Sequence, residues 1–73
     1  MKNKAKCLVK EGKLFIDKDF EEVIVQIFNS NGTLFRQLAP GESSEAVTLP
    51  GKGFYLVVIQ AVNQVFVHKV ECD

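Results

Sequence analysis

Short apolar stretches separated by turn-forming residues run along the whole chain. The stretches are rich in β-branched and aromatic residues, which suit a pleated sheet, and none shows the 3.6-residue period of an amphipathic helix. The pattern therefore predicts strands at residues 6–10, 13–16, 23–29, 33–38, 46–49, 54–62 and 65–72. About seven short strands with frequent turns predict an all-β fold, a small antiparallel β-sandwich with Greek-key connections.

Periodicity within the stretches separates central strands from outer ones. Residues 54–62 are apolar on nearly both faces, and residues 23–28 carry Val23, Val25 and Ile27 on one face and Ile24, Gln26 and Phe28 on the other. We expect these two strands in the middle of the fold. In the final stretch one face carries Val65, Val67, Lys69 and Glu71, and the other carries Phe66, His68, Val70 and Cys72. We expect this last strand to line the core on one side only.

Turn residues mark where the strands connect. Asn31-Gly32 can adopt the positive φ angles of a tight hairpin turn, so residues 33–38 should fold back on residues 23–29 as an antiparallel pair. Further turns are expected at residues 11–12, 17–22, 39–45, 50–53 and 63–64.

The composition is that of one small globular domain. The chain has 73 residues, of which 47% are hydrophobic and 25% are charged. This apolar content excludes a disordered protein, and residues 1–73 are expected to form a single domain. No apolar run approaches the ~20 residues that a transmembrane helix needs. Because a domain of this size buries only about 60% of the surface exposed by its unfolded chain, we expect marginal stability.

The charges cancel overall but are unevenly distributed. Nine lysines and arginines balance nine acids, so no net charge attracts nucleic acid or an anionic membrane. Residues 1–11 form a basic segment, in which Lys2, Lys4 and Lys6 share one face of a strand. Lysines on an edge strand deter pairing with another molecule. Since no aromatic residue alternates with these lysines to stack a base, nucleic acid is not an expected partner.

The two cysteines, Cys7 and Cys72, lie near the ends of the sequence. They can form a disulfide, which would stabilise the fold by roughly 4 kcal/mol and require an oxidising compartment, or they can be two buried thiols. The sequence leaves both alternatives open, because a disulfide needs Cα atoms within about 7 Å of each other.

The start of the sequence is not a signal peptide. Basic residues follow Met1, but no apolar stretch comes after them. We therefore expect either a cytoplasmic chain or one piece of a longer exported protein.

Few residues could carry catalysis. His68 and Cys72 are four positions apart on one predicted strand, roughly 13 Å, whereas a nucleophile and its base must lie ~3 Å apart. Cys7 could face His68 across a sheet, but no third group is present to orient the imidazole. Zinc needs four ligands, and these residues supply three without the paired spacing of structural sites.

Acidic residues at Asp17, Asp19 and Glu21 alternate like the start of a calcium-binding loop. Glu22 stands where such a loop needs glycine, and Phe28 stands where it needs a bidentate glutamate. A solvated acidic loop is therefore the favoured interpretation. The sequence also has no glycine-rich phosphate loop and no nucleophile elbow, so we expect neither an enzyme nor a cofactor.

Four motifs occur in an order typical of one protein family. They are Gly12-Lys13-Leu14-Phe15-Ile16, then Val25-Gln26-Ile27-Phe28-Asn29-Ser30-Asn31-Gly32-Thr33-Leu34, then Leu49-Pro50-Gly51-Lys52-Gly53-Phe54-Tyr55-Leu56-Val57, and finally Lys69-Val70. With these motifs, residues 12–73 resemble the C-terminal sorting domains of the type IX (Por) secretion system. The resemblance implies an immunoglobulin-like β-sandwich.

The resemblance also implies a non-enzymatic secretion signal. Domains of this family are carried across the outer membrane at the end of their cargo, are recognised by the secretion machinery and are typically cleaved by a sortase-like peptidase. The residues implied in recognition are Gly53, Tyr55, Lys69 and Val70. The chain would then be exported, from the periplasm to the outer-membrane surface or beyond, as part of a longer protein. A partner could recognise a last strand with an exposed edge by forming main-chain hydrogen bonds with it.

Two other functions fit the same fold. A cell-surface immunoglobulin-like module would bind protein or glycan, or space other domains, with ligand contacts on loops such as residues 39–45. Alternatively, the chain could form a homodimer through an edge strand. The fold alone does not choose among these functions.

Overall fold

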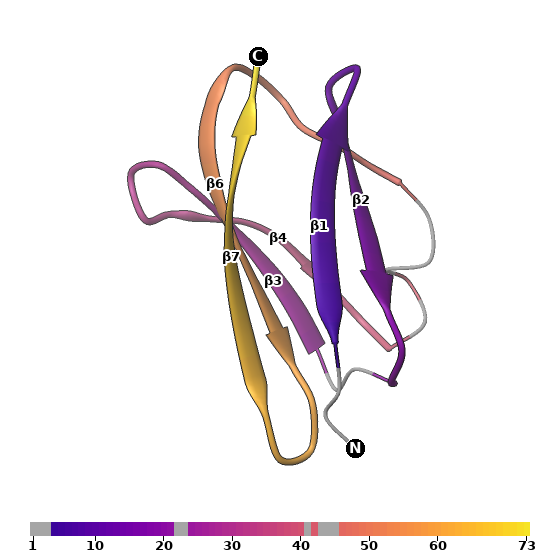
Figure 1. The fold of residues 1–73 in the computed structure, drawn as a ribbon. Coiled ribbons are helices and arrows are strands. Elements are labelled where there is room, and N and C mark those ends of the chain that lie inside the picture. The colour runs from indigo at the N-terminus through magenta and orange to yellow at the C-terminus, as the bar shows by residue number, and fades with distance from the viewer. Residues whose placement is uncertain (1–3, 22–23, 41, 43–45) are drawn as a thin grey trace.

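The computed structural model describes residues 4–21, 24–40, 42 and 46–73. Its strands are β1 (Ala5–Lys10), β2 (Lys13–Lys18), β3 (Ile24–Asn29), β4 (Leu34–Leu38), β5 (Val47–Thr48), β6 (Gly53–Gln60) and β7 (Val65–Cys72). In this part of the chain the strands form two antiparallel sheets, in the orders β1-β2-β5 and β4-β3-β6-β7 (Figure 1). The predicted all-β antiparallel sandwich of about seven strands is confirmed.

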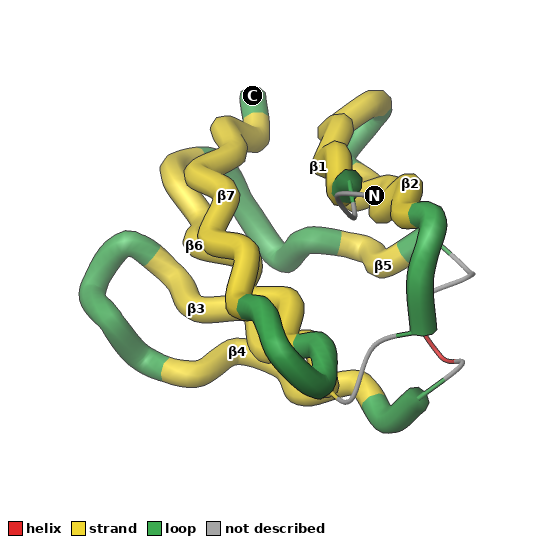
Figure 2. The backbone as a smooth tube through the Cα atoms, turned by 60° about the horizontal axis from the view of Figure 1, so that its bottom comes forward, coloured by secondary structure: helices red, strands yellow, loops and turns green. Residues whose placement is uncertain are grey.

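The two sheets form separate layers, which Figure 2 shows facing each other. The chain passes between the layers after β2, after β4 and after β5. At one flank β1 and β7 lie side by side, one from each layer (Figure 1). No backbone ladder joins these two strands within the described residues, so this flank is a seam between the sheets.

Inward-facing side chains of both sheets build the core. Its largest fully buried members are Leu14, Ile27, Leu38, Ile59, Val25 and Val57. Burying side chains of this kind contributes about 1.5–3 kcal/mol each relative to leaving them exposed. From β7, Val70 and Cys72 point into this core, while Val65, Val67 and the other alternate residues are exposed. The last strand thus lines the core on one side only, as predicted.

The predicted hairpin between β3 and β4 is confirmed, with one difference in its turn. The backbone N–H of Asn29 donates to the Thr33 carbonyl at 2.9 Å, and the N–H of Gly32 donates to the Asn29 carbonyl at 3.0 Å. Gly32 has a φ of 83°, whereas Asn31 does not enter the left-handed region. A register shift between Ile27 and Phe28 accompanies this longer turn.

Strand bounds differ from the predicted ones by a few residues. β2 continues to Lys18, into the predicted acidic turn, because Asp17 pairs with Lys6 on β1. β6 ends at Gln60, since the N–H of Ala61 donates to the Gln64 carbonyl and starts the turn to β7. The predicted strand residue at position 23 lies outside the described residues.

The sheet order confirms that β3 and β6 are central strands. Both were expected in the middle of the fold because of the apolar residues on their two faces. The inward residues of β6, such as Val57 and Ile59, are fully buried, but its outward residues Phe54 and Leu56 are 45% and 39% exposed. In the described part of the chain, no second layer covers that outward face.

Candidate recognition site

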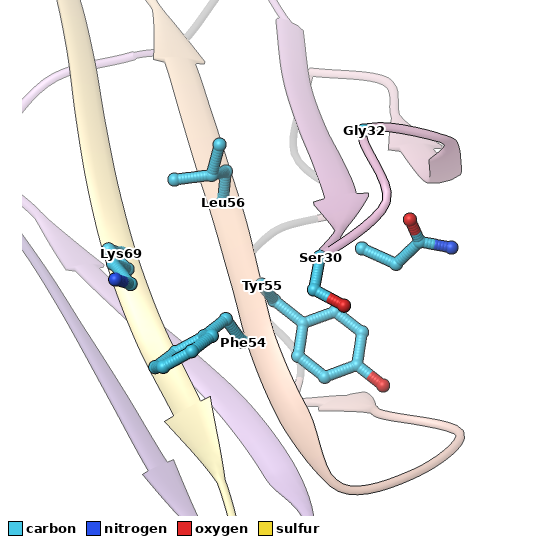
Figure 3. Close-up of a pocket in the computed structure, with 7 residues that line it drawn as sticks. Ser30, Gly32, Phe54, Tyr55, Leu56 and Lys69 are labelled. Carbon is cyan, nitrogen blue, oxygen red and sulfur yellow. The ribbon is translucent and has the colours of Figure 1, made fainter.

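A hollow of about 310 Å³ lies at one end of the outward face of the four-stranded sheet (Figure 3). The turn between β3 and β4 bounds one side, and the β6–β7 pair bounds the other. The residues that line it are Asn29, Ser30, Gly32, Phe54, Tyr55, Leu56 and Lys69. This volume is at the lower end of the 300–1,000 Å³ range of small-ligand sites, so it suits one side chain or a small group.

Lys69 is the charged residue of the hollow. Its Nζ lies 4.0 Å from the centre of the Phe54 ring, which places the ammonium over the ring face. Lys69 pairs with Leu56 across the β6–β7 ladder, so the ladder register positions the lysine beside both apolar side chains. A cation–π contact at an exposed site contributes about 0.5–1 kcal/mol. The pair therefore presents a positive charge and an apolar ring together.

Asn29 fixes the turn that forms the opposite wall. Its side-chain oxygen accepts hydrogen bonds from the backbone N–H groups of Asn31 and Thr33, both at 3.0 Å. Such local bonds stabilise a turn whose backbone groups face solvent. The wall beside the hollow is thus held by bonds to the backbone on both sides of Gly32.

Tyr55 is buried at this end of the sheet and holds the segment before β6 in place. Its side chain is only 4% exposed. The hydroxyl donates to the Gly51 carbonyl at 2.9 Å and accepts from the Gly51 N–H at 3.2 Å. The ring also meets the edge of Phe35, with centroids 6.2 Å apart and planes inclined by 62°. These contacts tie the segment before β6 to the core.

The four residues implied in recognition come together in the structure. Gly53 and Tyr55 lie on β6, Lys69 and Val70 lie on the adjacent β7, and Tyr55 pairs directly with Val70. Tyr55 and Val70 are buried, whereas Lys69 is exposed. Of the three side chains, only that of Lys69 is therefore placed to touch a partner.

Gly53 has a backbone role. Its φ is 124°, a conformation that residues with a Cβ rarely adopt. An added Cβ would meet no atom within 4 Å, so the conformation rather than lack of space requires glycine. This residue sets the direction in which the chain enters β6.

Sequence reasoning missed Phe54 and Leu56 as members of this site. A stretch that is apolar on both faces predicts burial on both faces, and the missing second layer becomes visible only in the sheet order. The one available signal was Lys69, which the antiparallel pairing of residues 54–62 with residues 65–72 would place beside them.

Both cysteines are free thiols in the structure, Cys72 buried and Cys7 half-buried. Burial raises the pKa of the Cys7 thiol to about 11, so little of the reactive thiolate is present at neutral pH. The choice between a disulfide and two buried thiols stays a prediction. His68 points inward from β7, and its Nε2 is buried without a hydrogen-bond partner in the described part of the chain.

Two of the acidic residues near β2, Asp17 and Asp19, contact β1 or the residue before it. The carboxylate of Asp19 accepts a hydrogen bond from the Lys4 N–H at 2.8 Å, and Asp17 belongs to β2. Glu22 lies outside the described residues. Among the residues that the structure does describe, no group of three or more His, Cys, Asp or Glu residues could hold a metal ion.

The chain matches no protein-family model, and neither a curated protein nor a solved structure shows significant similarity to it. Within the described residues there is also no helix long and apolar enough to cross a membrane.

Proposed function

We propose that this chain is a non-enzymatic sorting signal, which directs an exported protein across the outer membrane through a secretion system of the type IX kind. The proposal is supported by the ordered motifs of residues 12–73 and by the β-sandwich that they form. The observation that carries it is the position of β7. This strand lies at an edge of its sheet, and its outward side chains Val65, Val67, Lys69 and Glu71 are exposed.

The buried and the exposed residues of the motifs have different roles. Tyr55 and Val70 hold β6 and β7 in the core, and Gly53 sets the entry into β6. Lys69, beside Phe54 and the hollow, is the part that a partner reaches. Such a site suits a protein partner that brings an apolar side chain together with a carboxylate or carbonyl oxygen.

Side-chain recognition fits this position better than strand addition. The free edge of β7 faces the seam where β1 lies alongside it, so an added strand would have to displace β1. The outward face of β7 needs no such displacement, because its side chains already face solvent. The partner would therefore read Lys69 and its neighbours from the face of the sheet.

An export assay in a host that carries the secretion system tests the proposal. The fusion should end in all of residues 1–73, because β1 is part of the sandwich and a fusion from residue 12 would remove it. A periplasmic reporter joined to this domain should reach the cell surface. A reporter that stays in the periplasm while the domain is folded rejects the sorting function.

A pair of charge reversals locates the recognised surface. Lys69→Glu should reduce export by at least about tenfold, because it removes the cation at the hollow. Lys10→Glu is the matched control, since Lys10 is exposed on β1 in the other sheet. Equal export of the two variants would show that the β6–β7 surface is not the recognised one.

A further inference from the structure

The outward face of the four-stranded sheet, called here the open face, holds most of the exposed apolar surface. Its strongly exposed apolar residues are Leu34 (44%), Phe54 (45%), Leu56 (39%), Val65 (62%) and Val67 (61%). Half-buried Ile24, Phe28 and Val58 lie between them in the sheet. These residues come from all four strands.

The register makes these side chains one continuous patch. Leu56 on β6 lies between Phe28 on β3 and Lys69 on β7, and Phe28 pairs in turn with Leu34 on β4. In the next row Val58 pairs with Val67 on β7. A contiguous apolar patch rimmed by polar residues is characteristic of a protein interface.

We infer that the open face is an interface with a second copy of this chain. Five side chains exposed by 39 to 62% present roughly 400–500 Å² of apolar surface, the size of the largest patch on a typical monomer. Glutamine side chains and the Lys69–Glu71 row extend the face toward the roughly 800 Å² per partner of a standard interface. A dimer in which two open faces stack would bury this patch together with the polar side chains around it.

A row of three glutamines makes the open face complementary to itself. Gln26 donates to the Gln37 side chain at 3.2 Å and accepts from Gln60 at 3.4 Å. The row ends in a free amide donor at Gln37 and a free carbonyl acceptor at Gln60, counting contacts among the described residues. In a symmetric dimer the donor end of one copy can bond to the acceptor end of the other.

Charge also favours the open face over the opposite one. The chain has nine basic and nine acidic residues, so two copies do not repel at long range. On the outward face of β1 and β2, an exposed pair, Leu8 and Phe15, is flanked by Lys6, Lys10 and Lys13, and Asp17 lies opposite Lys6. Three lysines against one aspartate leave this face with an excess of two positive charges, so two copies of it would repel each other, whereas Lys69 and Glu71 on the open face balance.

The inference does not rest on the sorting function. Self-association is measured with the purified chain, whereas sorting is measured by export from a host, so either can fail alone. Because Lys69 lies on the open face, a second copy and a secretion partner would compete for it. Self-association would then cover the apolar surface of the open face until the secretion partner binds.

Sedimentation equilibrium from about 1 µM to about 1 mM tests the inference. The wild-type mass should rise with concentration from that of a monomer to that of a dimer. A monomer at every concentration overturns the inference, and so does growth beyond the dimer, because two stacked open faces leave no further open face.

Two matched pairs of substitutions locate the interface. Val67→Lys on the open face and Leu8→Lys on the opposite face replace side chains that are both 61% exposed. Phe54→Lys and Phe15→Lys form a second pair, at 45% and 42% exposure. Each open-face variant should raise the dissociation constant by at least about tenfold, because it places an unpaired charge in the interface. Each opposite-face variant should stay within about twofold of wild type.

Circular dichroism of each variant confirms that it is folded before its association is compared. If both members of a pair weaken the dimer equally, or if only the opposite-face variants weaken it, the open face is not the interface. Two pairs are used so that loss of folding in one variant leaves the other pair to decide.

Discussion

Replacing Tyr55 by phenylalanine isolates the contribution of its hydroxyl to the fold. The substitution removes the two hydrogen bonds to Gly51 and keeps the buried ring in its edge contact with Phe35. A hydrogen bond of this kind contributes a net 0.5–1.5 kcal/mol, roughly. Gly51 is exposed, so water can reach its backbone groups once the hydroxyl is gone. We therefore expect a combined loss of about 1–2 kcal/mol in the free energy of unfolding.

A second substitution, Tyr55→Ala, measures how much the buried ring contributes to the free energy of unfolding. It removes a side chain that is 4% exposed and leaves a cavity, which costs about 3–5 kcal/mol for large aromatic residues. A domain of this length has a total stability of roughly 4–11 kcal/mol, from about 0.05–0.15 kcal/mol per residue. Tyr55→Phe should therefore remain folded at 25 °C, whereas Tyr55→Ala should lose much of its stability or all of it.

The measurement is urea and thermal unfolding followed by far-ultraviolet circular dichroism. Fluorescence is unsuitable, because Tyr55 is the only tyrosine and the sequence has no tryptophan. The expected decrease in Tm for Tyr55→Phe is about 4–8 °C for each kcal/mol lost. If Tyr55→Phe melts with the wild type, the bonds to Gly51 do not stabilise the fold. If it unfolds as readily as Tyr55→Ala, the hydroxyl matters more than the ring, and the assignment of Tyr55 as a packed anchor is wrong.

Three further substitutions or reactions test other parts of the structure. Cys7 should react with iodoacetamide at pH 8 far more slowly in the folded protein than in urea, because a thiol with a pKa of about 11 is thiolate in about one molecule per thousand at that pH. The same raised pKa makes the folded state favour the protonated thiol, so this contribution to stability is complete below pH 9.0 and is lost as the pH rises toward 11. Gly32→Ala should lower the free energy of unfolding by about 1–2 kcal/mol, because Gly32 has a φ of 83°. Gly51→Ala is the control and should be nearly neutral, since Gly51 has an ordinary φ and space for a Cβ. Equal melting temperatures of the two variants would contradict the turn assignment. His68→Leu should raise stability by about 1 kcal/mol, because it removes a buried nitrogen that has no hydrogen-bond partner among the described residues. A decrease in Tm would show that the imidazole makes a favourable contact.

Local patterns predicted most of the strands correctly. The alternation of residues 65–72 predicted that β7 lines the core on one side only, and Val70 and Cys72 are the buried residues on that side. The hairpin at Gly32 was also predictable, because a turn is set by a few consecutive residues. The bounds of β6 were less accurate, since the bond between Ala61 and Gln64 that ends it depends on the whole β6–β7 hairpin.

The candidate site was only partly predictable. The motifs identified Lys69 and Tyr55, and the structure places them on adjacent strands. Their difference in burial was not predictable from the motifs, because a motif does not show which face of a strand is covered. Phe54 and Leu56 were missed for the same reason, although they line the hollow beside Lys69.

The amino-acid order alone determines where this chain extends and where it turns, because side-chain alternation and turn geometry act over a few neighbouring residues. Only the tertiary structure decides which apolar faces are hidden. Burial of β6 depends on a second sheet that is distant in sequence, and that sheet covers Val57 and Ile59 but leaves Phe54 and Leu56 in contact with solvent. A strand with two apolar faces therefore has the same local pattern whether it is covered on one face or on both.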